Sequence, residues 1–152
     1  MELPQLEFAI ELKIHVSKPE EVGATAKGTR KIIAITGGSF EGPDVKGVIV
    51  PGGYDWQLIR SDGVAEIDAR YVLKTDDGAL ITIVNKGLRH GPADVMQRLA
   101  KGEVVDPSLY YFRSVVSFET GEKKYDWLTK NMFMATGSRE PQLVIIRVWK
   151  IL

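Results

Sequence analysis

The stretch PGGYDWQ, residues 51–57, combines two glycines with residue types that build binding sites. Glycine adopts backbone angles that other residues avoid, so Gly52 and Gly53 allow a sharp turn that aims the following side chains. The carboxylate of Asp55 has the chemistry of a general base or hydrogen-bond acceptor, and Trp56 offers an apolar wall to a ligand. A β-bulge in which Asp55 caps backbone amides explains the same residues without a ligand. The sequence pattern favours neither interpretation.

Two later segments carry charged residues on one face of a strand-like pattern. In residues 64–74, Asp68 and Arg70 lie on the face opposite an apolar one. An exposed outer face with local ion pairs is the simpler interpretation. The alternative turns this face inward, where Asp68 and Arg70 form a buried ion pair or an anion-binding fork. A second such segment carries Arg113 and Glu119, and alternation alone does not decide which face is inside.

Composition excludes several classes of function. The chain has no cysteine, which excludes disulfides, thiol nucleophiles and cysteine-based zinc sites. His15 and His90 stand far apart without metal-ligand spacing, and no phosphate-binding or dinucleotide-binding motif is present. We therefore expect neither a metal nor a cofactor.

Charge and hydropathy exclude further partners. The 20 Lys and Arg residues balance the 20 Asp and Glu residues without a basic stripe, so we expect no nucleic-acid partner. No apolar run approaches the roughly 18 residues that span a bilayer, so we expect no membrane partner. The opening MELPQLEF lacks the features of a signal peptide, which favours a cytoplasmic protein.

Strand-like segments separated by turn signals dominate the chain and predict an all-β, mainly antiparallel fold. About eight or nine strands joined by short turns favour a calycin-like or lipocalin-like closed barrel over a sandwich. We expect one domain over residues 1–152. The expected strands cover 8–16, 31–36, 45–50, 55–60, 64–74, 79–85, 109–119, 127–137 and 143–152, with one short helix over 93–103.

The helical segment belongs to a longer stretch, residues 87–106, that interrupts the strand pattern. Gly91, Pro92 and Gly102 supply hinge positions, so the stretch is a candidate lid over a pocket. A helix that closes one end of the barrel fits the same pattern equally well.

Several short segments together resemble a known family, DUF-3237, also called UPF-0311. Their order and spacing carry the resemblance over nearly the whole chain: VGATAKGTRKI, GVIVPGGYDWQ, SDG, DARY, TDDG, Asn85-x-Gly87, VDPSLYYFRS, FET and YDWL. Two positions depart from the pattern, because Tyr54 stands where the family usually has Ala and Thr129 where it tends to have Asn.

The resemblance implies a calycin-type antiparallel barrel and a limited set of functions. Some fungal members resemble cofactor-free cyclases that close an oxygen ring. Polar residues clustered in a lumen are costly unless they are paired or used. Their recurrence in the family therefore favours a polar lumen in which they have such a role. The recurring polar positions of the family correspond to Arg30, Asp55, Asp68, Arg70, Asn85, Arg113 and Glu119.

These observations predict a cofactor-independent isomerase or cyclase acting on a small organic acid, phenol or enol. Asp55 or Glu119 would be the general base, and Arg70 and Arg113 would hold an enolate, phenolate or carboxylate. Trp56 and Trp127 would clamp the apolar body of the ligand. The remaining candidates for substrate binding are Arg30, Asp68 and Asn85.

Two other functions fit the same residues. A lipocalin-like protein would bind a small molecule in the pocket without changing it. A structural module would use the charged rows as salt bridges between two copies of the chain, with large side chains filling the lumen. The enzyme and the binding protein differ in whether a bound ligand leaves changed or unchanged.

Overall fold

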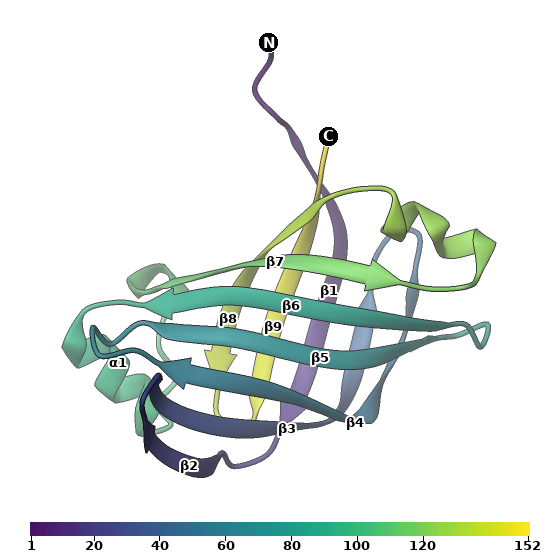
Figure 1. Cartoon of the computed structure of the whole chain (residues 1–152). Coiled ribbons are helices and arrows are strands. Elements are labelled where there is room, and N and C mark those ends of the chain that lie inside the picture. Colours follow the sequence, from purple (N-terminus) through teal and green to yellow (C-terminus); the bar gives the residue numbers. More distant parts are fainter.

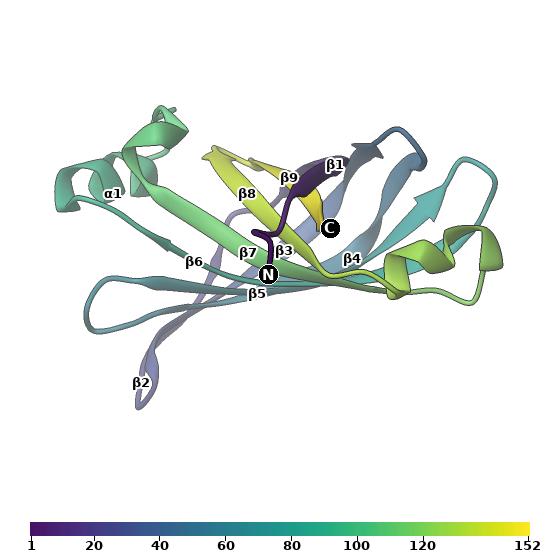
Figure 2. The ribbon, with the colours of Figure 1, turned by 90° about the horizontal axis from the view of Figure 1, so that it is seen from above.

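A single antiparallel sheet that closes on itself forms most of the molecule. The computed structural model describes all 152 residues. Eight strands follow the order β1-β9-β8-β7-β6-β5-β4-β3, and a pairing between β1 and β3 closes the ring (Figure 1). The ninth strand, β2, pairs with β3 alone and projects from the barrel (Figure 2). The expected closed antiparallel barrel with one short helix is confirmed.

The elements follow one another through short connections, apart from the helical segments after β6 and after β7. The strands are β1 Leu6–Val16, β2 Glu20–Thr25, β3 Gly28–Glu41, β4 Lys46–Ile59, β5 Ala65–Thr75, β6 Leu80–His90, β7 Tyr111–Glu119, β8 Phe133–Glu140 and β9 Leu143–Ile151. The helix α1 covers Ala93–Ala100, and two 3-10 helices cover Pro107–Leu109 (η1) and Lys123–Thr129 (η2). No helix is both long and apolar enough to cross a bilayer.

The PGG stretch is an irregularity inside one strand, where the sequence predicted a break between two. Val50 pairs with Val72 and Tyr54 with Arg70, so β4 advances by four residues where β5 advances by two. Gly52 takes a φ of 116°, which favours glycine. The chain absorbs the two extra residues as a β-bulge and continues as the same strand. The β-bulge interpretation of this stretch is therefore confirmed.

Two segments differ from the expected strands. The start of 127–137 is wrong, because the 3-10 helix η2 runs to Thr129 and β8 begins at Phe133. Side chains bond locally to the backbone there: the Thr129 hydroxyl donates to the Asp126 carbonyl, and Asn131 Nδ2 donates to the Trp127 carbonyl. Such bonds compete with a strand ladder. The strand β2 was not expected, since it is mostly exposed and lacks alternating hydrophobicity.

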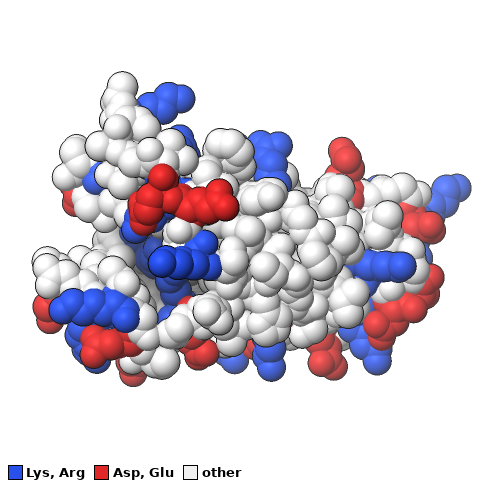
Figure 3. All heavy atoms as spheres, turned by 90° about the horizontal axis from the view of Figure 1, so that it is seen from below, with Lys and Arg blue, Asp and Glu red and all other residues white.

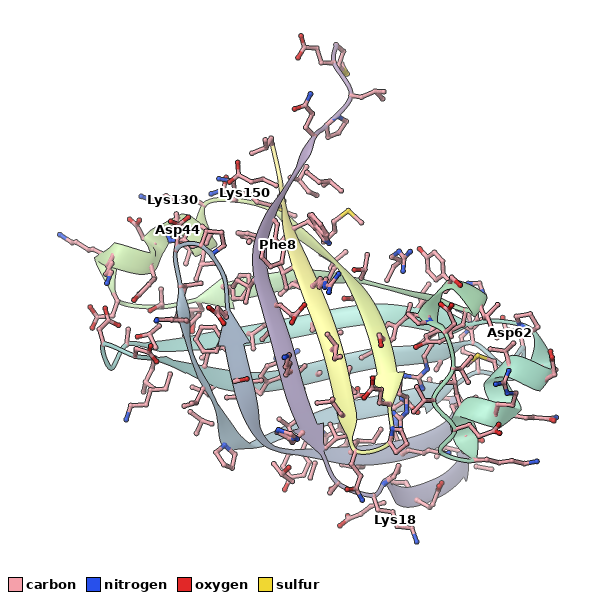
Figure 4. All side chains as sticks on the ribbon, turned by 180° about the vertical axis from the view of Figure 1, so that it is seen from behind. Phe8, Lys18, Asp44, Asp62, Lys130 and Lys150 are labelled. Carbon is pink, nitrogen blue, oxygen red and sulfur yellow. The ribbon has the colours of Figure 1, made fainter.

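The two ends of the barrel are covered by different elements. At one end, called the α1 end, α1 packs through the buried residues Val95 and Leu99. At the other, called the η2 end, η2 packs through Tyr125 and Leu128. Figure 4 labels Asp62 beside the α1 end, with Asp44 and Lys130 at the η2 end. The apolar core fills the barrel between these two ends.

Candidate functional site

A cavity lies inside the barrel and has mainly apolar walls with a few convergent polar groups. Its volume is about 40 Å³, which is space for a few water molecules or for one functional group of a ligand. Isoleucine and valine side chains from β1, β3 and β9 form much of the wall. The polar residues of the lining are Asp55, Asn85, Arg89 and Arg139, together with the hydroxyl-bearing Tyr71.

Strand register gives the depth of each polar group along the barrel. On β6, Arg89 pairs with Ala65 at the start of β5, which is the α1 end. Asn85 pairs with Ala69, which in turn pairs with Asp55 on β4, so these two polar residues flank a small side chain at middle depth. Tyr71 is the next inward residue of β5 toward the η2 end. From the α1 end inward, the polar side chains therefore follow in the order Arg89, then Asp55 and Asn85, then Tyr71.

Asp55 is a carboxyl group enclosed by the barrel wall, with only 9% of the residue exposed. Its Oδ1 accepts a hydrogen bond of 3.0 Å from the backbone N–H of Asp68, where the register between β4 and β5 skips from Asp55 to Leu58. Burial raises the pKa of Asp55 above its ordinary value, although this hydrogen bond and the nearby arginine charges act in the opposite direction. A buried carboxyl with a raised pKa has the properties of a general base.

Two arginines share this cavity without an ion-pair partner. Arg89 is 7% exposed, and burial, followed by the charge of Arg139, lowers its pKa to about 10. Burial likewise lowers the pKa of Arg139. No acidic oxygen lies within 4.0 Å of either guanidinium, although Arg89 stacks 5.4 Å from the ring centroid of Phe112. Poorly hydrated cations of this kind attract an anion strongly.

Several polar atoms in the lumen are buried and have no protein partner. Native proteins leave few such atoms, and those that occur usually meet water or a ligand. Five of them belong to inward-facing residues: Gln57 Nε2, Tyr71 OH, Asn85 Oδ1, Arg89 Nε and Ser114 Oγ. The lumen therefore presents more hydrogen-bonding capacity than the protein itself satisfies.

A second hollow, called the mouth, lies between the α1 end of the barrel and α1. Its volume is about 340 Å³, and Arg89 and Arg139 line it as well as the inner cavity. Met96 and Leu99 of α1 give it one apolar side. Figure 3 shows this hollow from below, with Lys and Arg side chains inside it and acidic side chains on its rim. Because Arg89 and Arg139 line both hollows, we call the mouth and the inner cavity together the funnel and the position of these arginines its neck.

The comparisons with known proteins place the chain in a family. A family model described as "Protein of unknown function (DUF3237)" matches residues 4–151. The chain belongs to this family. A UPF0311 protein from Rhodopseudomonas palustris (strain TIE-1) is 37% identical over 98% of this chain and 99% of the relative. A UPF0311 protein from Clostridium acetobutylicum is 39% identical over 95% of this chain and 92% of the relative.

Solved structures of DUF3237 relatives have the same barrel. A protein of unknown function from Rhodopseudomonas palustris matches with a TM-score of 0.97 at 34% identity, over 100% of both chains. A β-barrel-like protein from Acinetobacter baumannii matches with a TM-score of 0.87 at 42% identity, over 100% of this chain and 98% of the other.

A more distant likeness leads to a fungal enzyme. A hydroalkoxylation enzyme from Penicillium herquei is 22% identical over 97% of this chain and 84% of the relative. The crystal structure of an enzyme from Penicillium herquei matches with a TM-score of 0.72 at 22% identity, over 98% of this chain and 95% of the other. At this identity the likeness shows the fold alone.

The structure brings two of the DUF3237 candidates together in the lumen and leaves the charged rows outside it. Asp55 and Asn85 both line the inner cavity. The alternative in which Asp68 and Arg70 face inward is wrong, because the buried positions of β5 are the odd-numbered ones. The even-numbered residues face outward, and Arg70 Nε lies 3.9 Å from Asp68 Oδ1 on the outer surface.

Arg113 and Glu119 also lie outside, since β7 buries only its even-numbered positions. A hollow of about 590 Å³ is an outer groove that includes Arg70 and Glu119. Water screens exposed charges in such a groove, so a strong anion site does not arise there.

The remaining candidates do not form the expected clamp around the lumen. Trp56 is 55% exposed on the outer face, and its carbonyl accepts a hydrogen bond of 2.9 Å from Arg30 Nη1. Trp127 lies at the η2 end, with its ring centroid 6.2 Å from that of Phe133. The two tryptophans therefore lie on different surfaces of the barrel, and neither lines the inner cavity.

Sequence reasoning missed Arg89, Arg139, Tyr71 and Ser114 as residues of the lumen. For Arg89 a signal existed, because the alternation that turns Asn85 inward also turns every second residue after it inward. The expected strand ended at residue 85, whereas β6 continues to His90. Arg139 carries no comparable signal, since β8 lacks a clear alternation around Gly137.

Proposed function

We propose that this protein is a cofactor-independent enzyme that moves a proton within a small organic acid, phenol or enol, as an isomerase or cyclase does. The observation that carries the proposal is the grouping of Asp55, Arg89 and Arg139 around one cavity without an ion pair. A buried base beside one buried and one half-buried cation suits a reaction in which negative charge builds up on the substrate.

The size of the two hollows suggests how a substrate would bind. The inner cavity of about 40 Å³ accepts a functional group, whereas the mouth of about 340 Å³ accepts a larger body. We therefore assign the reacting group to the lumen and the rest of the molecule to the mouth, against Met96 and Leu99. The arginines at the neck would then lie beside the bond that reacts.

The proposed reaction needs one base and no external reactant. Asp55 takes a proton from a C–H or O–H bond of the substrate, and the bonding electron pair stays on the substrate as a delocalised anion. Arg89 and Arg139 stabilise this anion. Asp55 then returns the proton to a different atom, which completes an isomerisation or a ring closure.

The fungal relative's name is consistent with this reaction class. Hydroalkoxylation adds the O–H bond of an alcohol across a carbon–carbon double bond: oxygen bonds to one carbon, and the proton that leaves oxygen is matched by a proton that reaches the other carbon. A base that accepts and returns one proton meets both needs. We take this as support for the class of reaction and not for a particular substrate.

The test begins with native mass spectrometry of the protein after exposure to a metabolite extract. We expect a retained acid, phenol or enol, which is then incubated with the protein in D₂O and examined by NMR. Deuterium uptake at carbon that wild-type protein catalyses and Asp55→Asn does not would support the enzyme. A retained ligand that never exchanges or rearranges would favour a binding protein, and no retained ligand from several extracts would favour a structural module.

A further inference from the structure

Tyr71 is an inward-facing tyrosine whose hydroxyl group makes no hydrogen bond within the protein. The residue is 4% exposed, and its hydroxyl oxygen is buried without a hydrogen-bond partner. Two other buried tyrosines differ in this respect, since the Tyr110 hydroxyl accepts from the Arg139 backbone N–H and the Tyr125 hydroxyl donates to Asp77. Tyr71 instead lines the same cavity as Asp55, and the charge of Asp55 acts on its hydroxyl group.

The bulge in β4 makes room for this tyrosine. A Cβ atom on Gly53 would lie 2.4 Å from Tyr71 Cβ and 2.6 Å from the Arg70 carbonyl oxygen. Any larger residue at position 53 would therefore push Tyr71 away from its present position. Asp55 follows two residues later on the same strand and pairs with Ala69, the inward residue just before Tyr71. One short stretch of β4 thus positions both the carboxyl group and the phenol.

The phenol keeps its proton in this environment. Burial, and after it the negative charge of Asp55, raises the pKa of Tyr71 above its ordinary value. A group that stays protonated donates a hydrogen bond and is a poor proton source. Its chemistry is therefore that of an oxyanion-binding donor, which is strongest when the acceptor oxygen carries negative charge in a dry site.

We propose that Tyr71 is a catalytic residue that donates a hydrogen bond to a substrate oxygen, on which negative charge builds while Asp55 holds the transferred proton. This inference rests on the proposed function and narrows its substrate class to enolisable carbonyl compounds and phenols. The oxygen enters the lumen beyond Asp55, and no bond to Tyr71 forms or breaks. The rest of the substrate extends past the arginines into the mouth.

The test uses 4-nitrophenol, whose yellow phenolate form reports both binding and ionisation. Wild-type protein, Tyr71→Phe and the control Tyr54→Phe are titrated with it near neutral pH. Tyr54 lies on β4 with 47% of its surface exposed, so the control removes a hydroxyl that does not face the lumen. We expect Tyr71→Phe to bind the phenolate about 10-fold to 100-fold more weakly, as for a lost hydrogen bond to a charged group. We expect Tyr54→Phe to match wild type.

Two further measurements separate this role from a structural one. 4-Nitroaniline has a similar shape and no negative oxygen, so its binding should change little in Tyr71→Phe. The melting temperature of Tyr71→Phe should equal or exceed that of wild type, because the substitution removes an unpartnered buried hydroxyl. A clear fall in melting temperature would indicate a structural hydroxyl and would overturn the inference.

The outcomes also separate the inference from the proposed function. Phenolate binding that is equal in wild type and Tyr71→Phe, and is lost in Arg89→Met, would overturn the role of Tyr71 and leave the anion-binding lumen intact. A wild-type protein that binds no phenolate would overturn both proposals.

Discussion

At the scale of single residues, the lumen holds an unequal set of charges. Asp55 is the only buried acidic residue, whereas Arg89 and Arg139 both reach the same cavity. Two positive charges and one negative charge leave an excess that a singly charged anion would neutralise. Buried charge without compensation is costly, so the arrangement favours an anionic ligand or intermediate over a neutral one.

The first prediction concerns Asp55 and pH. Because its folded pKa lies above the ordinary value of 3.8, the folded protein binds more protons than the unfolded chain in the interval between the two values. Asp55 therefore reduces stability as pH rises through this interval. Asp55→Asn, which can keep the acceptor for the Asp68 N–H, should be the more stable protein at neutral pH, by about 1.4 kcal/mol for each unit of pKa shift.

Urea unfolding of wild type and Asp55→Asn at a series of pH values measures this difference. We expect it to grow from pH 4 upward and to level off above the folded pKa of Asp55. A wild-type protein that stays the more stable one at neutral pH would contradict the raised pKa.

The second prediction compares an inner with an outer arginine. Arg89→Met removes a buried cation without an ion-pair partner, so we expect 4-nitrophenolate binding at least about 10-fold weaker and no loss of melting temperature. Arg70→Met is the matched control, because Arg70 lies exposed on the neighbouring strand. Isothermal titration of both variants checks the result. A loss of binding in Arg70→Met alone would return the anion site to the outer face.

At the scale of elements, β4 and α1 shape the funnel. On the two sides of its bulge, β4 turns Ile49 and Asp55 toward the inside of the barrel. The helix α1 packs over the mouth through Val95 and Leu99, and Met96 faces the hollow. The segment 87–106 therefore closes one end of the barrel, which was one of the two expectations for it. Its movement as a lid stays a prediction.

The third prediction concerns the bulge. Gly53→Ala should lower the free energy of unfolding by roughly 1–3 kcal/mol, because the new Cβ overlaps with Tyr71 Cβ. It should also weaken phenolate binding by displacing Tyr71. Gly121→Ala is the control, since a Cβ there meets nothing within 4 Å. Denaturant unfolding and titration of both variants provide the measurement, and equal stability of the two would mean that the bulge has free space.

The fourth prediction concerns access through the mouth. Met96→Trp adds bulk to the helix face that lines the hollow, and we expect slower and weaker binding of 4-nitrophenolate with little change in stability. Arg98→Trp adds the same bulk to an exposed position of α1 that does not line the mouth. Stopped-flow absorbance compares the association rates. Equal rates in the two variants would indicate that ligands reach the lumen by another route.

At the scale of the whole molecule, two aspartates in different parts of the barrel change its stability with pH in opposite directions. The η2 end is fastened by Asp77, which accepts hydrogen bonds from the Thr75 and Tyr125 hydroxyls and from Lys124 Nζ. These bonds, that of Thr75 first, hold the pKa of Asp77 well below its ordinary value. Asp55 behaves in the opposite way. The charge of Asp77 therefore stabilises the η2 end of the fold, whereas the charge of Asp55 in the lumen destabilises it.

The fifth prediction follows from this contrast. A lowered folded pKa contributes stability above the ordinary value of 3.8, and this stability is lost as pH falls through the lower folded value. Asp77→Asn should therefore be less stable than wild type at neutral pH, with the difference shrinking in acid. Thermal unfolding from pH 2 to pH 7 checks this. A difference of the same sign as that of Asp55→Asn would contradict the assignment.

The sequence by itself determined the class of fold and much of the strand arrangement. Alternating residues and Asp-Gly turns predicted a closed antiparallel barrel, and the glycines at 52 and 53 marked a bulge that exists. Both follow from local rules, because side-chain alternation and turn chemistry depend on residues near one another in the chain. Asp55 was found among the site candidates for the same local reason, whereas Asn85 was a candidate only through the resemblance to the family.

Tertiary structure alone decided which charged residues meet. Alternation groups Asp68 with Arg70 and Arg113 with Glu119, but it does not say which face of a strand is inside. The lumen face was settled by packing: β5 turns Ala65, Ile67 and Ala69 inward, which leaves its charged row in water. Asp55, Arg89 and Arg139 come from β4, β6 and β8, and only closure of the barrel brings these distant strands around one cavity.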